Sequence, residues 1–585
     1  MATKKKEVID TFSLVSDDPA VPRPRLHKLI IKNFRTVGSV PLEIELDEIV
    51  VLVGPNNVGK STILRAYEVA MKQGSKEGKL SIDDFPYGKV DPAALPEIEL
   101  HTIVFTKPGE RWIARLENGE DMIRERWIWK SPNEDPKRQG FDVEKGDWDD
   151  QAPWGLPTVA NSRRPLPHRI EAFSSPDTQA KEISELLLTI LREKLKSLKS
   201  DDQQETSDYE RLLGQIGALQ QKVVQSAQVE IVQIEEAISE LLAKVFPKHV
   251  IKLDPKIDVD LEKTLTPFKA SPELLMGPED GYLSRISEQG SGARRTLLWT
   301  ALRYLSESDV AAAASQRPHV LLLDEPEICL HPAAIREARK VLYDLPKSGN
   351  WQVMITTHSP VFIDLSQDNT TVVRVDRGGD NAVRSTTLFK PSKAKLDEDD
   401  KKNMKALNAC DPYVNEFFFG SNIVIVEGDT EYTAFCLMQE IQPEKYSDLH
   451  IIRARGKGII ATLMKVLNQF SASYGVLHDS DTPMVGEAKN PAWGMNKSIL
   501  LEKSRAADGR VRHVACLTDF EVALFGKIQK ADKPYNALLK LRDNEALQVA
   551  VSKLLDSLIS DSEPPANCRR WSSIEELEQY VAELD

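Results

Sequence analysis

The stretch that decides the fold of the first half of the chain is VVLVGPNNVGKST, residues 50–62. It starts as a short apolar run rich in valine, passes through a loop with two glycines, and ends where apolar residues take helical spacing. Strand, glycine-bearing loop and helix in this order are the context of a Walker A loop, which binds phosphates with backbone N–H groups at a helix N-terminus. A glycine turn that fits by chance is the alternative. The context favours a nucleotide-binding α/β domain.

Within this loop, residue types have definite chemical roles. Lys60 would reach the β- and γ-phosphates, and Ser61 would ligate Mg²⁺. We therefore expect bound ATP with Mg²⁺. The candidate binding residues of the loop are Gly54, Asn57, Gly59, Lys60, Ser61 and Thr62.

A second part of the same site follows about 260 residues later, in HVLLLDEPE, residues 319–327. Asp324, at the end of an apolar strand, would hold Mg²⁺ through water, and Glu325 would polarise the water that attacks the γ-phosphate. His358, in MITTHSP after a further strand, stands where ABC-type ATPases have a histidine that senses the γ-phosphate. For His358 alone, a helix-cap or core histidine is the alternative.

Two features indicate self-association. SEQGSGARR, residues 287–295, resembles a degenerate ABC signature loop, in which Ser291 and Gly292 would contact nucleotide. In the ABC architecture this loop completes the site of a second subunit, so the resemblance implies a homodimer or higher homo-oligomer. Residues 178–247 carry apolar residues at helical spacing and are predicted as a helical dimerisation insert. A helical hairpin folded back on its own lobe is the alternative.

Acidic residues follow three apolar strands in the C-terminal half. The stretches are IVIVEGDTE, GVLHDSD and CLTDFE. The carboxyl ends of parallel strands meet at one edge of an open α/β sheet, so these acids should converge there. They could hold two Mg²⁺ or Mn²⁺ ions, which prefer carboxylate ligands, and two such ions can promote phosphodiester cleavage. Acids scattered over the surface are the alternative. The candidate metal ligands are Glu427, Glu431, Asp479, Asp481, Asp519 and Glu521.

Composition limits the remaining possibilities. The chain has 585 residues, 41% of them hydrophobic, and a net charge of −14. This length predicts more than one core, and the charge argues against a uniformly basic nucleic-acid surface while leaving room for a local basic groove. The chain has no run of ~18 apolar residues, so we expect a cytoplasmic protein without a membrane segment. Five scattered cysteines argue against a disulfide framework or a zinc site.

The order and spacing of the acids resemble a Toprim domain, and the chain from about residue 25 resembles the OLD (overcoming lysogenization defect) family, which includes the Gabija anti-phage nuclease subunit. This resemblance implies an α/β fold in which an ABC-type ATPase domain with a helical insertion precedes a Toprim nuclease domain. It also implies a catalytic lysine after the last acid, and KADKPYN offers Lys533 for that role. A solvated lysine is the alternative.

These motifs divide the chain into six parts. They are an N-terminal tail (1–24), two parts of the ATPase domain (25–177 and 248–392), the helical insert between them (178–247), a linker (393–420) and the Toprim domain (421–585). The resemblance implies an ATP-regulated, metal-dependent DNA endonuclease in anti-phage defence, with DNA as substrate and a helicase or other defence protein encoded alongside as a possible partner. The alternatives are an SMC-, RecF- or Rad50-like repair ATPase that binds DNA without cutting it, and a primase-like Toprim enzyme.

Overall fold

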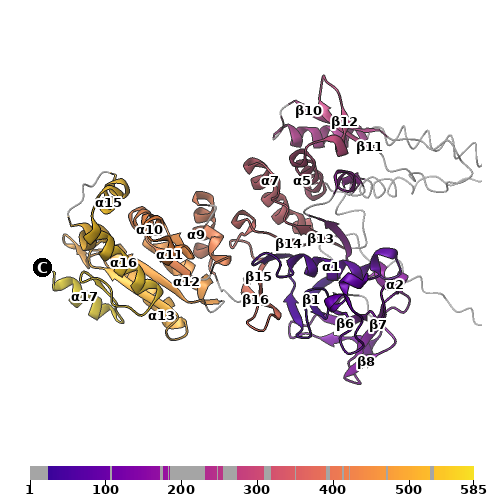
Figure 1. The fold of residues 1–585 in the computed structure, drawn as a ribbon, viewed down its shortest axis with the longest axis horizontal. Helices are drawn as coiled ribbons and strands as arrows, with labels where there is room; N and C mark the ends of the chain where they lie inside the picture. Colours follow the sequence, from indigo (N-terminus) through magenta and orange to yellow (C-terminus); the bar gives the residue numbers. More distant parts are fainter. Residues whose placement is uncertain are drawn as a thin grey trace, which may run out of the picture. The chain divides into compact units, whose positions relative to one another are not determined.

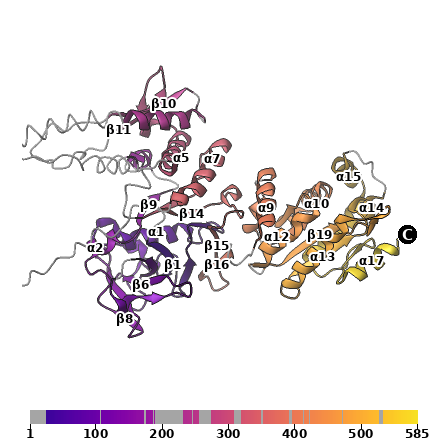
Figure 2. The same ribbon diagram turned by 180° about the vertical axis from the view of Figure 1, so that it is seen from behind.

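The computed structural model divides into two compact units, each described by itself below. The first unit comprises the described residues of Met1–Val50, Gly59–Thr357 and Arg377–Arg384, and the second those of Val51–Val58, His358–Asp376 and Ser385–Asp585. Figures 1 and 2 show the ribbon from opposite sides. The described residues are 24–105, 108–171, 175–181, 183–184, 187, 231–244, 246, 248–254, 273–307, 318–348, 351–390, 396–411, 414–420, 422–469, 472–526 and 532–584.

An antiparallel sheet forms one layer of the first unit, in the order β2-β1-β4-β6-β7-β8, with β5 beside β6. Apolar and polar side chains alternate through residues 96–130, and β4 and β6 form there. Trp127 and Trp129, on and just after β6, are fully buried, which identifies them as core residues. The strands are β1 (Arg25–Lys32), β2 (Leu42–Glu45), β4 (Glu97–Val104), β5 (Ala114–Arg115), β6 (Asp121–Ile128), β7 (Lys137–Asp142) and β8 (Asp147–Asp149).

A second sheet has the order β16-β15-β3-β14-β13-β9. Strands β13 and β14 run parallel and every residue in them is buried, as expected for strands covered on both faces. The strands are β3 (Ile49–Val53), β9 (Leu166–Ile170), β13 (His319–Asp324), β14 (Trp351–Thr356), β15 (Thr370–Arg377) and β16 (Val383–Phe389). Helices α1 (Lys60–Met71), α5 (Ser291–Glu307) and α7 (Pro332–Asp344) accompany it, and β10 (His249–Asp254), β11 (Glu273–Pro278) and β12 (Ser284–Arg285) form a separate small sheet.

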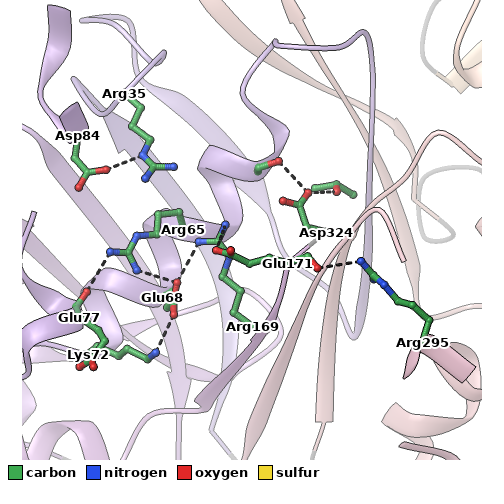
Figure 3. A network of polar contacts seen from close by, with 12 residues as sticks. Arg35, Arg65, Glu68, Lys72, Glu77, Asp84, Arg169, Glu171, Arg295 and Asp324 are labelled. Carbon is green, nitrogen blue, oxygen red and sulfur yellow. Dashed lines mark hydrogen bonds and ion pairs between the residues drawn. The ribbon is translucent and has the colours of Figure 1, made fainter. Parts of the chain in front are cut away.

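Glu68 ties helix α1 to strand β9 (Figure 3). Its carboxylate accepts hydrogen bonds from Arg65 Nη1 at 2.9 Å, from Lys72 Nζ at 2.8 Å and from Arg169 Nη1 at 3.1 Å. Burial raises the pKa of Glu68, but the surrounding cations outweigh burial and lower that pKa to about 2. Because α1 begins at the phosphate loop, this cluster fixes the helix whose N-terminus would face the nucleotide.

The second unit contains a sheet in the order β18-β17-β19-β22-β23. The first four strands are parallel and β23 is antiparallel to β22. The chain leaves β17 to form β18 on one side and returns to form β19 on the other, so the carboxyl end of β17 lies at a topological switch point, where open α/β sheets bind ligands. The strands are β17 (Asn422–Val426), β18 (Leu449–Arg453), β19 (Tyr474–Asp479), β22 (Val511–Cys516) and β23 (Cys568–Arg569).

Helices cover both faces of this sheet. Side chains from alternate strand positions, among them Val424, Leu477 and Val514, form a core with α10 (Asp429–Ile441), α14 (Phe520–Phe525), α15 (Lys533–Arg542) and α16 (Glu545–Ile559). Ala515, which points the opposite way, packs with Trp571 and residues of α13 (Pro491–Arg505) and α17 (Ile574–Ala582). Helix α12 (Lys457–Gln469) packs against α13. The second half of the chain is therefore the predicted α/β layer structure.

The range predicted as a linker, 393–420, is folded where the structure describes it. Helix α9 (Glu398–Cys410) starts at an Asp397–Asp400 capping box, buries Met404 and Leu407, and packs against α12. The N-terminal tail and most of the helical insert lie outside the described residues, so the predicted domain limits and the dimerisation role of the insert stay predictions. None of the described helices is both long and apolar enough to cross a membrane.

Glu68→Gln should destabilise the protein, because it removes the charge that the three cations stabilise. The folded-state pKa is about 2 against an ordinary 4.5, so this stabilisation is present above pH 4.5 and is lost as the pH falls through 2. We expect a loss of about 3 kcal/mol at pH 7 and about half of that at pH 3, measured by urea unfolding. The control is Glu43→Gln, which breaks a half-exposed pair with Lys28 and should cost less than about 1 kcal/mol. Equal losses for the two variants would contradict the prediction.

Candidate metal centre and nucleotide site

Strand ends in the second unit bring the predicted acids to one edge of the sheet. Glu427 directly follows β17, and Asp479 is the last residue of the neighbouring strand β19. The backbone N–H of Asp479 donates to Glu427 Oε2 at 3.1 Å, and the N–H of Phe520, after β22, donates to Asp479 Oδ1 at 2.8 Å. Three strand ends are thus linked through these two carboxylates, as the spacing predicted.

Glu431 adds a buried carboxylate from the first turn of α10, with only 4% of its surface exposed. A Cβ at position 428 would lie 3.1 Å from Glu431 Oε2, so Gly428 leaves room for the carboxylate to approach the loop before the helix. The glycine in the EGDTE motif therefore has a packing reason.

Glu521 and Asp519 come from the start of α14. Glu521 Oε1 accepts from the Thr430 hydroxyl at 2.9 Å, and its Oε2 lies 3.1 Å from Lys533 Nζ at the start of α15. Asp519 caps α14 by accepting from the N–H of Val522 at 2.7 Å. Lys533, predicted only through the family resemblance, therefore lies beside one of the predicted acids.

Asp481 is held by a lysine. The residue takes a left-handed backbone conformation with φ 58°, and its N–H donates to the carbonyl of Thr518 at 3.0 Å. Its Oδ2 accepts from Lys457 Nζ at 2.6 Å. Sequence reasoning missed Lys457; the only signal was a lysine beside a glycine, RARGKG, directly after a strand.

Burial and the charges of neighbouring acids raise the pKa values of Glu431 and Asp479, so these two carboxyl groups are hard to ionise. Burial, followed by the charges of Glu427 and Glu521, raises the pKa of Glu431 to about 7. Burial also raises the pKa of Asp479 well above its ordinary range, and the charges of Glu431, Glu427, Glu521 and Asp519 add to that effect. The ionised forms of buried carboxyl groups that repel one another are favoured only when a cation offsets their negative charge.

The donor chemistry fits divalent cations, because all six groups are carboxylates, the ligands that Mg²⁺ and Mn²⁺ prefer. Within the described residues, no group of three or more His, Cys, Asp or Glu side chains is already arranged to hold a metal ion. The carboxylates instead accept hydrogen bonds from backbone N–H groups, as Glu427, Asp479 and Asp519 do. Cation binding would exchange some of these hydrogen bonds for metal–oxygen bonds.

In the first unit, Asp324 joins the helix after the phosphate loop to two neighbouring strands (Figure 3). Its Oδ1 accepts from the Ser61 hydroxyl at 2.9 Å and from the Thr356 hydroxyl at 2.6 Å. Asp324 and Thr356 are register partners at the ends of β13 and β14. The predicted pair Ser61 and Asp324 is therefore brought together, and Thr356 is a polar neighbour that sequence reasoning did not identify.

Lys60 and Glu325 lie close to this pair. Lys60 is 6% exposed; burial lowers its pKa, opposed by the charges of Glu325, Asp324 and Glu327. Glu325 has φ 44°, a conformation that non-glycine residues adopt at a cost, and its N–H donates to the carbonyl of Thr356 at 3.0 Å. The backbone thus holds the predicted water-polarising residue in one strained position.

The positions of the other residues predicted to contact the nucleotide do not by themselves indicate a role. Gly54 has φ 139°, and a Cβ there would lie 2.1 Å from the carbonyl oxygen of Val375, so only glycine fits. Asn57 has φ 60° and is exposed, Gly59 precedes α1, and Thr62 is buried in it. Ser291 and Gly292 begin α5, and His358, in the second unit, is exposed after β14. The roles of all these residues stay predictions.

Glu431→Gln should stabilise the metal-free protein at alkaline pH. The folded-state pKa of about 7 lies above the ordinary 4.5, so the native state is favoured below pH 4.5 and loses stability as the pH rises through 7. In EDTA we expect the variant to be up to about 3 kcal/mol more stable than wild type at pH 8.5, and within about 1 kcal/mol at pH 5. Urea unfolding at both pH values measures this, and a variant less stable than wild type at pH 8.5 would refute it.

Comparison with known proteins agrees with this two-part arrangement. The family described as "AAA domain, putative AbiEii toxin, Type IV TA system" matches residues 49–364. The "Overcoming lysogenization defect protein-like, TOPRIM domain" family matches residues 418–481. The first match covers more than half of the chain, and the second includes the strand ends that carry Glu427, Asp479 and Asp481.

Individual relatives extend over both parts. The Old nuclease of Escherichia phage P2 is 23% identical over 473 residues, which cover 78% of this chain and 77% of the relative. The OLD nuclease of Thermus scotoductus is 22% identical over 526 residues, 87% of this chain and 93% of the relative. Among solved structures, an Smc head bound to the C-terminal winged-helix domain of ScpA aligns with 63% of this chain and 99% of its own at 16% identity and a TM-score of 0.39.

By the first match, the chain belongs to the AAA-domain family. Its AAA domain is followed by an OLD-like Toprim domain, and the chain is therefore a member of the OLD family.

Proposed function

We propose that this protein is a DNA endonuclease that requires Mg²⁺ or Mn²⁺, is regulated by ATP, and acts in anti-phage defence. The observation that carries the proposal is the gathering of Glu427, Glu431, Asp479 and Glu521, with Asp519 beside them, at the carboxyl edge of the sheet in the second unit. A structural role does not explain this gathering, because buried carboxylates that repel one another cost stability. The names of the two relatives as nucleases support the same function.

The proposed chemistry assigns a role to each group. Divalent cations bound by these acids would activate a water molecule and stabilise the leaving oxygen of a phosphodiester. Asp479 would contribute most to cation binding, because the charges of four other acids act on its carboxylate. Lys533, with 40% of its side chain exposed and its ammonium at Glu521, can reach a phosphate and stabilise its developing charge. Burial opposes its ionised form, but the hydrogen bond to Glu521 raises its pKa and keeps it protonated.

ATP binding at the first unit would provide regulation. Ser61 and Asp324, joined by a 2.9 Å hydrogen bond, would hold Mg²⁺ with the nucleotide, and Glu325 would position the attacking water. We propose that Ser291 and Gly292 contact ATP bound by a second copy, that His358 senses the γ-phosphate, and that the protein acts as a homodimer or higher homo-oligomer. A helicase or other defence protein remains the proposed partner.

The nucleotide site is tested by two substitutions. Lys60→Ala should abolish ATP binding, because the lysine supplies the charge that balances the phosphates. Glu325→Gln should bind ATP but hydrolyse it at least a hundredfold more slowly, because the amide cannot polarise water in the same way. A nucleotide-binding assay and phosphate release measure both effects. Normal ATP turnover by Lys60→Ala would refute the assignment of the loop.

Asp479→Ala and Glu427→Ala should abolish DNA cleavage, because each removes a charged ligand from the cation site. Both variants should keep ATPase activity. Nicking and linearisation of supercoiled plasmid in Mg²⁺ and in Mn²⁺, with and without ATP, measure the effect, and Asp561→Ala, which removes a largely exposed acid of the same domain, is the control. Cleavage by wild type that persists in EDTA, or variants that cut as well as wild type, would leave a DNA-binding ATPase as the better hypothesis.

A further inference from the structure

Lys457 is a buried cation at the acidic edge of the sheet that neither predicted motif includes. Only 2% of its side chain is exposed, and its ammonium lies 2.6 Å from Asp481 Oδ2 and 3.4 Å from the carbonyl of Ser480. An ammonium group in this position is maintained only if nearby negative charge offsets the loss of water. The lysine therefore belongs electrostatically to the acidic edge.

The local backbone is built to place this side chain. Arg455 and Gly456 have φ 58° and 132°, and the N–H of Gly456 donates to the carbonyl of Glu427 at 2.9 Å. Lys457 then begins α12, whose first turn contains no acidic residue. A lysine at a helix N-terminus is opposed by the helix dipole, so the stability of α12 does not explain it. The acids at the sheet edge do.

The charge of Lys457 acts on Glu427 as well as on Asp481. Burial raises the pKa of Glu427, and Lys457 is the strongest influence that opposes this rise. The acids that act on Asp479 are Glu431, Glu427, Glu521 and Asp519. The edge therefore carries a built-in cation, bonded to Asp481, beside acids that repel one another.

We propose that Lys457 is a positioning residue that holds Asp481 and competes with a divalent cation for its carboxylate, so that the lysine limits how tightly the edge binds metal. An ammonium and a divalent cation on one carboxylate repel each other strongly in a buried place. The inference rests on the proposed function, since it assumes that the acids bind divalent cations. The inference adds Lys457 as a residue that sets the affinity of these acids for divalent cations.

The test is a Mn²⁺ titration of the full-length, nucleotide-free protein, in which the electron paramagnetic resonance signal reports free Mn²⁺. Asp479→Ala provides the background from other sites. Lys457→Met should bind Mn²⁺ at least tenfold more tightly than wild type, whereas Lys457→Arg, which keeps the charge, should stay within about threefold. The matched control is Lys465→Met, on the same helix, which removes an ion pair with Asp400 and should bind Mn²⁺ as wild type does.

A second comparison covers the case in which Lys457→Met does not fold. Asp481→Asn leaves the ammonium without its partner, so it should weaken Mn²⁺ binding. Adding Lys457→Met to Asp481→Asn removes that uncompensated charge and should restore binding at least fivefold relative to Asp481→Asn alone. Circular dichroism of each variant establishes that it is folded.

The outcomes separate this inference from the proposed function. Folded Lys457→Met that binds Mn²⁺ with wild-type or lower affinity would overturn the role of Lys457 while leaving the metal site intact. Equal affinities of Asp481→Asn and the double variant would do the same. Wild-type protein that binds no more Mn²⁺ than Asp479→Ala would overturn both the proposed metal dependence and this inference.

Discussion

Repulsion among buried carboxylates is the constraint on which the C-terminal half of this protein depends. Parallel strands end at one edge of a sheet, so acids placed after those strands come together whatever their separation in sequence. Here Glu427 follows β17 and Asp479 ends the neighbouring strand β19, while Glu431 and Glu521 lie in the first turns of the helices that come next. The raised pKa values of Glu431 and Asp479 reflect the cost of that arrangement, because burial and neighbouring negative charges disfavour the ionised carboxylates. A cation is the simplest way to offset it.

The fold manages this repulsion with groups of its own. Backbone N–H groups donate to Glu427, Asp479 and Asp519, Lys533 pairs with Glu521, and Lys457 pairs with Asp481. Each of these contacts holds a carboxylate in place without neutralising the whole edge. The carboxylates are therefore held in place by contacts within the protein, and the described residues contain no group of three or more His, Cys, Asp or Glu side chains already arranged to hold a metal ion.

The first unit also places polar side chains at the ends of adjacent strands, but only one of them is an acid. Asp324 and Thr356 end adjacent strands, and the Ser61 hydroxyl joins them from the helix after the phosphate loop. Glu68, about two turns further along that helix, accepts hydrogen bonds from three cations, and one of them, Arg169, lies on β9. A nucleotide site of this kind depends on the rigid placement of one helix N-terminus, and the ion cluster provides it.

The sequence alone determined the order of the two domains, the strand ends that carry the acidic residues and the six acids that influence one another, because strand periodicity and topology place such residues without knowledge of packing. It also indicated Lys533, but only through family resemblance. It did not indicate that residues 398–410 form a packed helix, or that Lys457 is buried against Asp481. Only the tertiary structure decided these, because a charge run looks solvated in sequence, and the partner of a buried lysine lies 24 residues away on another strand end.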